Sequence, residues 1–277
     1  MNERTKRIVT MVLAFACVAG AVMTVVSYLD SQESQKAYEM AIALASMPTE
    51  TVTADTQPTV APEETTLPEE TAPLQWVPET IEDDLIMMSL RSINLEALRQ
   101  VNPAVVGWIS IPNTKIHFPV TQGEDNSYYL SHTWDLKYNI AGGIFLETQN
   151  SKDMTDFNTI IYGHNMVNGS MFTDLMLFED PEFVANNPYV YLVTDEGIWR
   201  YEIFATHDAP VESRTYWVSF EENKFRKAYI QHALEMSYID TGITPELTDR
   251  ILTLSTCNGI SRASRRVVQA RLRMVQQ

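Results

Sequence analysis

A cysteine near the carboxyl end is the side chain of this sequence best suited to chemistry. Cys257 ends the stretch Leu252-Thr253-Leu254-Ser255-Thr256-Cys257, which has the apolar and β-branched character of a buried strand. A cysteine in such a place is either a small apolar residue that packs in a core or, as a thiolate, a nucleophile. The second interpretation requires further functional groups near the thiol.

A thiolate nucleophile needs a histidine partner and a group that stabilises negative charge on the substrate oxygen. Among the five histidines, His164 has the most specific surroundings, because the apolar stretch "TIIY" leads to Gly163 and then to His164. Glycine lets the backbone turn sharply, so His164 is expected at a strand end beside a loop. On position alone, His132 and His207 could also be functional. His117, within a predicted strand, is expected to be structural, and His232 is expected to be a solvated or half-buried residue of a helix.

Two adjacent arginines follow the cysteine. In "SRRVVQARLRM" the side chains of Arg265 and Arg266 point to opposite faces of a predicted strand. Arginines on a strand usually form an exposed charged face. An arginine eight residues after Cys257, on the next strand of a hairpin, can instead donate hydrogen bonds to a carbonyl or an oxyanion. The alternation alone does not decide which arginine faces the thiol.

Eight short stretches rich in Val, Ile and aromatic residues predict the strands that position these groups. They are residues 105–111, 115–122, 142–147, 159–165, 189–194, 198–207, 250–257 and 265–275. Three stretches have helical character: 85–101, 170–178 and 220–237. Short strands with mostly short connections predict a β-barrel or a sandwich. No Gly-rich phosphate loop and no metal-ligand spacing such as HExxH or CxxC occurs, so we expect neither a cofactor nor a metal.

The amino-terminal segment predicts a membrane anchor. Residues 8–29 carry no charge, and at about 1.5 Å per residue they are long enough to cross the roughly 30 Å hydrocarbon core of a bilayer. Arg4, Lys6 and Arg7 precede this span, so residues 1–7 are predicted to be cytoplasmic and the rest of this single-pass chain extracellular. A cleaved signal peptide is the alternative, but its apolar region is usually shorter.

Residues 30–84 predict an extended extracellular linker before an outer domain at 85–277. Between Pro48 and Asp84 ten residues are acidic and none is Lys or Arg, a composition that cannot bury enough apolar surface to fold. The net charge of −16 argues against a nucleic-acid partner, because phosphate binding needs a basic face. Since Cys17 lies in the predicted span, Cys257 has no disulfide partner in the outer domain, and an unpaired extracellular thiol is a candidate reactive group.

Three separated stretches resemble one family, the sortases, which are membrane-anchored cysteine transpeptidases of Gram-positive bacteria. "TLSTC" followed by Arg-x-hydrophobic-hydrophobic resembles the family's cysteine and arginine motifs, and "NTIIYGHNMVNGSMF" resembles the histidine segment of class B sortases. "VNPAVVGWISIPNTKIHFPVTQGEDNSYYLSHTW" is similar to the first strands of that class. The resemblance implies an eight-stranded β-barrel with an N-terminal helix, matching 85–101, and an extra helix before the Cys strand, matching 220–237.

The resemblance also implies roles for individual residues. Cys257 is the implied nucleophile, His164 its partner and Arg265 the arginine that holds the substrate oxygen, since Arg265 fits the family's frame better than Arg266. Leu254 and Thr256 are candidate site-lining residues that bind substrate. No metal and no cofactor is implied.

The implied substrates are surface proteins that carry a sorting signal resembling Asn-Pro-x-Thr-(Gly/Asn). The thiolate attacks the Thr carbonyl, and the thioacyl enzyme is resolved by an amine of a peptidoglycan precursor or by a pilin lysine. A catalytic domain outside the cell membrane agrees with this reaction.

Two other functions remain open on the sequence. A cysteine hydrolase of papain type is one, although that class usually begins a helix with its cysteine, whereas Cys257 ends a strand. A non-enzymatic, membrane-tethered β-domain with an inert Cys257 is the other.

Overall fold

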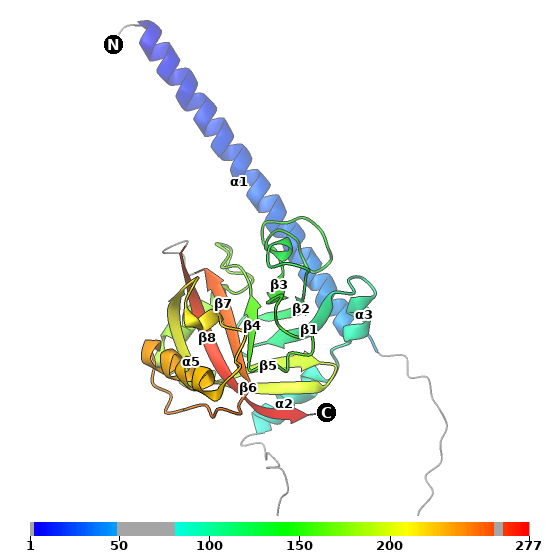
Figure 1. Ribbon diagram of the computed structural model, residues 1–277. Coiled ribbons are helices and arrows are strands. Elements are labelled where there is room, and N and C mark those ends of the chain that lie inside the picture. The colour runs from blue at the N-terminus through cyan, green and yellow to red at the C-terminus, as the bar shows by residue number, and fades with distance from the viewer. Residues whose placement is uncertain (1–2, 49–80, 258–262, 277) are drawn as a thin grey trace, which may run out of the picture.

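Eight strands form a closed barrel in the computed structural model, which describes residues 3–48, 81–257 and 263–276. The strands are β1 (Val105–Ser110), β2 (His117–Thr121), β3 (Ile144–Leu146), β4 (Asn158–Tyr162), β5 (Tyr189–Thr194), β6 (Gly197–Pro210), β7 (Ile251–Cys257) and β8 (Ser264–Gln276). Around the barrel they follow the order β1-β2-β3-β4-β7-β8-β6-β5 (Figure 1). Each overlaps one predicted strand, so the predicted eight-stranded barrel is confirmed.

Closure of the barrel depends on both kinds of strand pairing. Most neighbours are antiparallel, but β2 pairs with β3 and β4 pairs with β7 in parallel. The two longest strands, β6 with 14 residues and β8 with 13, pair along nearly their whole length. A closed barrel leaves no strand edge open to other chains. Strand β4 is buried at four of its five positions, as a parallel strand covered on both faces must be.

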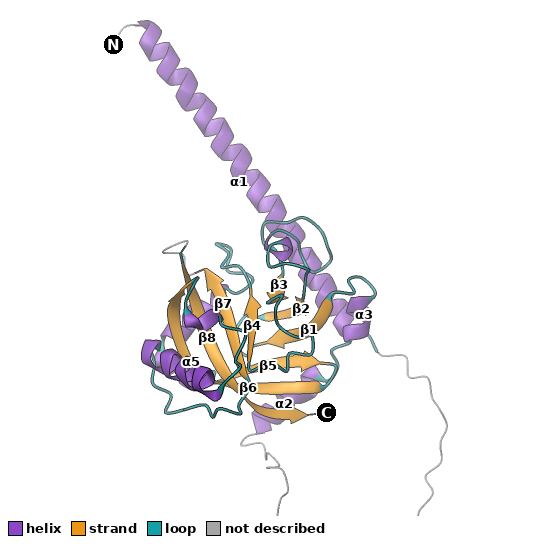
Figure 2. Ribbon diagram, in the orientation of Figure 1, coloured by secondary structure: helices purple, strands orange, loops and turns teal. Residues whose placement is uncertain are grey.

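Apolar side chains pack on both surfaces of the sheet. The main cluster includes Trp108, Trp199 and Tyr191, each at most 1% exposed, and burial of such a side chain contributes roughly 1.5–3 kcal/mol. A second cluster joins helix α5 (Asn223–Met236) to the outside of the barrel through Tyr229 and Phe204. Figure 2 shows α5 lying against the strands there. This helix confirms the one predicted at 220–237.

The other predicted helices differ in detail. The helix expected over 85–101 is divided into α2 (Ile81–Leu90) and α3 (Leu95–Arg99). Asn94 divides them, because its side chain caps α3 by accepting a hydrogen bond from the Ala97 N–H at 3.0 Å. The stretch 170–178 forms the 3-10 helix η2 (Thr173–Glu179), and a short helix α4 (Pro181–Asn186), which the sequence analysis did not predict, follows it. Two further 3-10 turns are η1 (Tyr128–Leu130) and η3 (Arg214–Tyr216).

The amino-terminal helix α1 (Glu3–Ala45) is longer than the predicted membrane span. Among the described residues it is the one helix that is long and apolar enough to cross a membrane. The sequence predicted an extended linker from residue 30, but α1 continues to Ala45, and Ala41 and Ala45 are fully buried against the barrel. The far part of α1 projects away from the barrel (Figure 1). The acidic part of the predicted linker, residues 49–80, lies outside the described residues.

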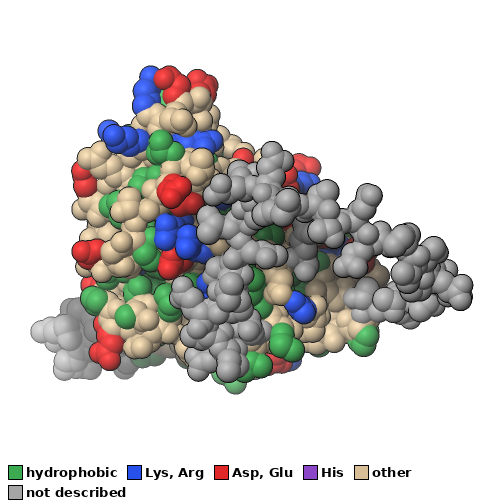
Figure 3. Space-filling view, turned by 90° about the horizontal axis from the view of Figure 1, so that it is seen from below, with side chains coloured by type: hydrophobic (Ala, Val, Ile, Leu, Met, Phe, Trp, Pro, Cys, Tyr) green, Lys and Arg blue, Asp and Glu red, His purple; other side chains and the backbone are tan. Residues whose placement is uncertain are grey.

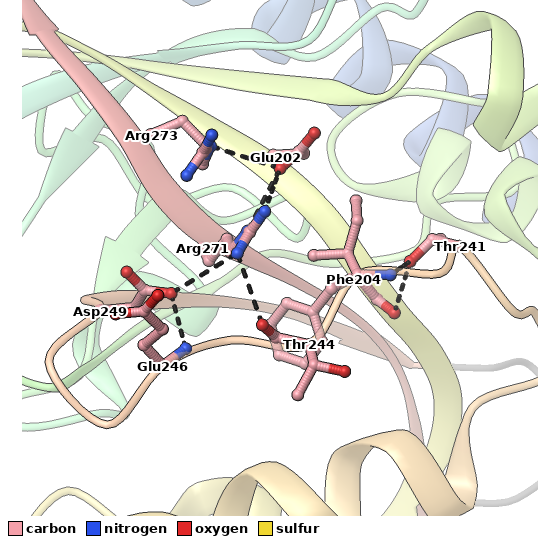
Figure 4. Close-up of polar contacts among 9 residues, drawn as sticks. Glu202, Phe204, Thr241, Thr244, Glu246, Asp249, Arg271 and Arg273 are labelled. Carbon is pink, nitrogen blue, oxygen red and sulfur yellow. Dashed lines mark hydrogen bonds and ion pairs between the residues drawn. The ribbon is translucent and has the colours of Figure 1, made fainter. Parts of the chain in front are cut away.

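A group of ion pairs fastens the segment between α5 and β7 to the barrel (Figure 4). Arg271 on β8 donates to the Glu202 carboxylate on β6 at 3.0 and 3.2 Å and to the Thr244 carbonyl at 3.4 Å. Its guanidinium also lies 3.8 Å from the carboxylate of Asp249, just before β7. Arg273 reaches the same Glu202 carboxylate at 3.5 Å. These contacts hold Thr244 and Asp249, which precede β7 (Ile251–Cys257), against β8.

Basic and acidic side chains are mixed on one face of the molecule. On the face seen in Figure 3, outside the part that grey atoms cover, Lys and Arg side chains lie beside Asp and Glu side chains. A continuous basic field is what a phosphate backbone requires. This face therefore offers no such field.

The two arginines that share Glu202 give a matched pair of variants. Arg271→Met should lower the free energy of unfolding by about 1–3 kcal/mol, because it leaves the half-buried Glu202 carboxylate and the Thr244 carbonyl short of donors. Arg273→Met should cost less than about 1 kcal/mol, because that side chain is 45% exposed. Thermal unfolding of the full chain in detergent, followed by circular dichroism, measures both. Equal losses for the two variants would contradict this account of the network.

Candidate active site

Three neighbouring strands bring the predicted site residues to one end of the barrel. Cys257, the last residue of β7, is paired with Arg265 on β8. On the other side of β7, Tyr162 of β4 is paired with Ser255, and the Gly163 N–H donates to the Ser255 carbonyl at 3.2 Å. His164 follows Tyr162 by two residues, as Cys257 follows Ser255. By this register His164, just beyond the end of β4, lies at the level of Cys257 and Arg265, which are paired on β7 and β8.

A cavity of about 520 Å³ opens at this level. Its lining comes from β3, β4, β7 and β8, from the segments that follow β3 and β4, and from the β2–β3 and β6–α5 connections: Asn126, Leu130, Phe145, Glu147, Gln149, Tyr162, Gly163, His164, Val211, Tyr216, Ser255, Thr256 and Arg265. This size is ordinary for a small-molecule or peptide site. Two of the three predicted catalytic side chains, His164 and Arg265, line it, and the backbone of the third, Cys257, follows directly after Thr256.

The two adjacent arginines have different surroundings. Arg265 lines the cavity, whereas the side chain of Arg266 is 3% exposed and is held away from it. Arg266 donates to the Asp208 carboxylate at 2.7 Å and to the Glu179 carboxylate at 3.0 Å. Its guanidinium also lies over the ring of Tyr238. Arg266 is thus engaged in ion pairs outside the cavity.

His164 is held by the connection between β2 and β3, residues 122–143. Its Nε2–H donates to the Leu130 carbonyl at 2.8 Å, and Leu130 ends the turn η1. Gly163 was expected to allow a sharp turn, but its φ is not in the left-handed region, and the reason for a glycine is packing. A Cβ at this position would collide with the Ile144 side chain and lie 2.7 Å from the Phe172 ring.

The structure separates the two candidate substrate-binding residues. Thr256 lines the cavity, although it is 1% exposed, and among the described residues its Oγ1 has no hydrogen-bond partner. Leu254 is also 1% exposed, but it packs in the core cluster opposite Ile161 and is not part of the cavity lining. Only Thr256 is therefore brought to the site.

One wall of the cavity is polar, and the sequence analysis did not predict it. The Glu147 carboxylate, on a side chain at the end of β3, accepts two hydrogen bonds of 2.8 Å from the Asn126 amide and one of 2.9 Å from the Tyr162 hydroxyl. Burial, together with the Glu147 charge, raises the pKa of Tyr162 well above its usual value. Tyr216 and Ser255 share a further hydrogen bond of 3.0 Å. Side chains from five separate segments form this wall, so no local motif marks it.

The other four histidines lie away from the cavity. His117 accepts a hydrogen bond from the Trp108 indole at 3.2 Å, and His132 stacks on Tyr128. His207 is fully buried and bonded to Thr215, with the ring of His232 beside it. Burial, the neighbouring His232 and the Arg266 charge lower the pKa of His207 to about 4. Of the two histidines left open by the sequence, neither reaches the candidate site.

A comparison with known families matches a model of the sortase domain to residues 109–273. This match includes His164, Cys257 and Arg265 and more than half of the chain.

The chain belongs to the sortase family.

Individual relatives of this sortase domain belong to class B. The chain is 35% identical to sortase B of Listeria monocytogenes over 164 residues, which cover 59% of this chain and 67% of that relative. Among solved structures, sortase B of Clostridium perfringens matches with a TM-score of 0.62 and 31% identity over 65% of this chain and all of that one. A sortase B–substrate complex from Staphylococcus aureus matches with a TM-score of 0.63 and 25% identity over 70% of this chain and 92% of that one. The predicted membership of class B is confirmed.

Sortases are cysteine transpeptidases, so the chain is an enzyme of this kind. The family match removes the interpretation of the barrel as a non-enzymatic binding domain. Nothing in the match assigns a role to a particular side chain, and the roles are therefore argued below from the geometry.

The buried His207 makes a contribution to the stability of the sortase domain that depends on pH. The folded protein keeps this ring neutral down to about pH 4, whereas the unfolded chain binds a proton near the usual 6.5. This contribution to stability is therefore fully present above pH 6.5 and is lost as the pH falls toward 4. The loss between pH 6.5 and pH 5 is roughly 2 kcal/mol.

His207→Gln should make the free energy of unfolding fall less steeply between pH 7 and pH 5. Thermal or chemical unfolding of the full chain in detergent at several pH values measures this slope. Identical slopes for the unchanged chain and the variant would show that His207 does not titrate in this way.

Proposed function

We propose that this sortase cleaves a carboxyl-terminal sorting signal resembling Asn-Pro-x-Thr-(Gly/Asn) after its Thr and transfers the protein to an amine. The observation that carries the proposal is the meeting of three residues beside one cavity: Cys257 and Arg265, which are paired on β7 and β8, and His164, which follows the end of the neighbouring β4. A thiolate, a proton donor and a cationic hydrogen-bond donor are the groups that acyl transfer requires.

The proposed first half-reaction forms a thioester. The Cys257 thiolate attacks the Thr carbonyl carbon, and the carbonyl oxygen becomes an oxyanion that accepts hydrogen bonds from the Arg265 guanidinium. The C–N bond then breaks, and protonated His164 gives its proton to the leaving nitrogen. The products of this step are the thioacyl enzyme, a neutral His164 and the released carboxyl-terminal fragment of the signal, which now has a free amino group at its start.

The second half-reaction reverses these roles with a different amine. The incoming amine attacks the thioester carbonyl, His164 takes the proton that the nitrogen loses, and Cys257 leaves as a thiolate. We propose a peptidoglycan precursor or a pilin lysine as the source of this amine. The enzyme returns to its starting protonation state, so no cofactor is needed to balance the reaction.

The different surroundings of Arg265 and Arg266 support the choice of arginine. Arg266 is already paired with the carboxylates of Asp208 and Glu179, so its charge is largely compensated and its donors are directed away from the cavity. Arg265 is paired in register with Cys257 and lines the cavity. A planar guanidinium at that place suits a carbonyl oxygen.

The strand position of Cys257 also bears on the papain-type alternative. Enzymes of that type present the cysteine at the start of a helix, whereas Cys257 ends β7 of a closed barrel. The two reactions also differ in product, because a hydrolase releases the acid even when an amine is present. Addition of an amine acceptor to the peptide assay therefore separates them.

We propose further that α1 anchors the enzyme in the cell membrane with its amino terminus in the cytoplasm and the barrel outside. The apolar character of α1 supports a membrane anchor, and Arg4, Lys6 and Arg7 before the span support this orientation. In Figure 1, β4 and β7 run toward the end of the barrel from which α1 projects. The candidate site would thus face the side of the anchor, where precursors bound to the membrane occur.

The two cysteines provide a matched test of the nucleophile. Cys257→Ala should abolish cleavage of a sorting-signal peptide in the full-length enzyme, because no thioester can form. Cys17→Ala, which changes the predicted membrane span, should leave cleavage unchanged. Mass spectrometry of the peptide products, with and without an amine acceptor, measures both cleavage and transfer. Transfer by Cys257→Ala at the unchanged rate would refute the assignment.

The two arginines provide a second test. Arg265→Gln should lower kcat by roughly 10²–10³-fold, the usual effect of removing an oxyanion donor, and leave the unfolding temperature nearly unchanged. Arg266→Gln should instead lower the free energy of unfolding by on the order of 1–3 kcal/mol, because Asp208 loses its buried partner. Peptide kinetics and thermal unfolding of both variants decide between the arginines. The opposite pattern would make Arg266 the catalytic one.

A further inference from the structure

The connection between β2 and β3 is held from two sides. On one side it supports the predicted catalytic histidine, because the Leu130 carbonyl accepts the hydrogen of His164 Nε2 at 2.8 Å. Gly142, in the same connection, packs directly beneath this contact: a Cβ there would lie 2.9 Å from the Leu130 oxygen and 3.1 Å from His164 Cδ2. Its φ of +60° and this close packing leave room only for glycine.

On the other side the same connection is bound by α1. The Tyr38 hydroxyl donates to the Gly142 carbonyl at 2.7 Å, and the Asn139 amide donates to the Asp30 carbonyl at 2.8 Å. The Trp134 indole donates to the Ala37 carbonyl at 2.7 Å. Figure 1 shows this connection lying against α1.

These contacts are buried rather than incidental. Trp134 is 0% exposed, Asn139 2% and Tyr38 7%. The Tyr38 ring also packs edge-on against Phe118 of β2, with centroids 5.0 Å apart. A buried hydrogen bond to a backbone carbonyl is costly to lose, because the carbonyl is left without a donor.

A separate contact joins α1 to the loop that carries the histidine. Asn168, four residues after His164, donates through its side chain to the Ser31 hydroxyl at 2.7 Å. The same Asn168 accepts hydrogen bonds from the Ser170 backbone and hydroxyl, which shape the loop. Helix α1 therefore contacts both segments that determine where the His164 ring lies.

We propose that the membrane-proximal helix is part of the catalytic apparatus, with Tyr38 a positioning residue that holds Gly142 and Leu130 so that His164 keeps its place. The proposal rests on the proposed function for its effect on turnover, but the structural link between Tyr38 and His164 does not. Helix α1 runs without a break from the predicted anchor to this connection. The contacts that orient the barrel on α1 are therefore the same contacts that position the His164 ring.

Tyr38→Phe tests the link because it retains the ring that packs on Phe118 and removes only the hydroxyl. Tyr138→Phe is the matched control: it removes a hydroxyl from a ring that is 70% exposed in the same connection. The full-length enzyme in detergent should show a kcat lowered roughly ten- to a hundred-fold in Tyr38→Phe, with a smaller change in KM, because a histidine out of place slows proton transfer. Tyr138→Phe should match the unchanged enzyme.

A second measurement does not depend on activity. Hydrogen–deuterium exchange at the histidine Cε1–H, resolved by mass spectrometry of peptides, reports on each imidazole separately. Tyr38→Phe should change the exchange rate at His164, because the connection that carries its partner, the Leu130 carbonyl, is held less firmly. The rates at His117 and His207, which do not contact this connection, should remain as they were.

The outcomes separate the two proposals. If the unchanged enzyme does not transfer the sorting peptide, the proposed function fails while the exchange measurement still decides the role of Tyr38. If Tyr38→Phe lowers the unfolding temperature but leaves both the His164 exchange rate and kcat unchanged, Tyr38 only stabilises the fold and the positioning role is wrong.

Discussion

The candidate site depends on the parallel pairing of β4 with β7. Parallel neighbours cannot be joined by a tight turn, so the chain makes a long excursion through η2, α4, β5, β6 and α5 before it returns as β7 beside β4. The hydrogen bond from Gly163 to Ser255 extends this pairing one residue beyond the end of β4. A shift of one residue would reverse every side chain of β7 between the two faces of the sheet. The register therefore determines whether His164 and Cys257 belong to one site.

The surroundings of β7 hold that register from several directions. Thr253 on β7 donates to the Asn158 amide oxygen on β4 at 2.7 Å, and the Tyr229 hydroxyl of α5 lies 2.9 Å from the same Thr253 hydroxyl. Gln269 of β8 donates to Tyr229 at 2.7 Å. A one-residue slip would leave these buried groups without partners, at a cost of several kcal/mol in total. Polar contacts thus specify the alignment, while apolar packing supplies most of the stabilisation.

The strands and the site motifs were accessible to sequence reasoning because their signals are local. Each strand is a short run of Val, Ile and aromatic residues, and His164 and Cys257 follow directly from two such runs. The family resemblance favoured Arg265, but the contacts that distinguish the two arginines are not local, because Arg266 is bound by Asp208 and Glu179, which are distant in sequence. The polar wall around Glu147 escaped prediction for the same reason.

The extent of α1 also escaped sequence reasoning. Residues 30–45 are too polar for a membrane span, and the apolar positions among them, such as Ala41 and Ala45, gain their partners only from the folded barrel. The buried residues of this stretch, such as Tyr38, Ala41 and Ala45, do recur at helical spacing, but they stabilise a helix only by packing on the barrel. The place of Leu254 in the core, outside the cavity lining, was also not evident from the sequence. A residue two positions before Thr256 shares its face of an isolated strand, but the core occupies that level of β7.

The central claim is that Cys257 carries the acyl group within a site built by β4, β7 and β8. The most direct measurement is the mass of the full-length enzyme after brief mixing with a sorting-signal peptide in the absence of an amine, followed by peptide mapping. The account predicts an adduct equal to the acyl fragment that ends in Thr, located on Cys257 and released when an amine is added. An adduct on another residue, or cleavage that proceeds with no adduct on Cys257 in rapidly quenched samples, would contradict it.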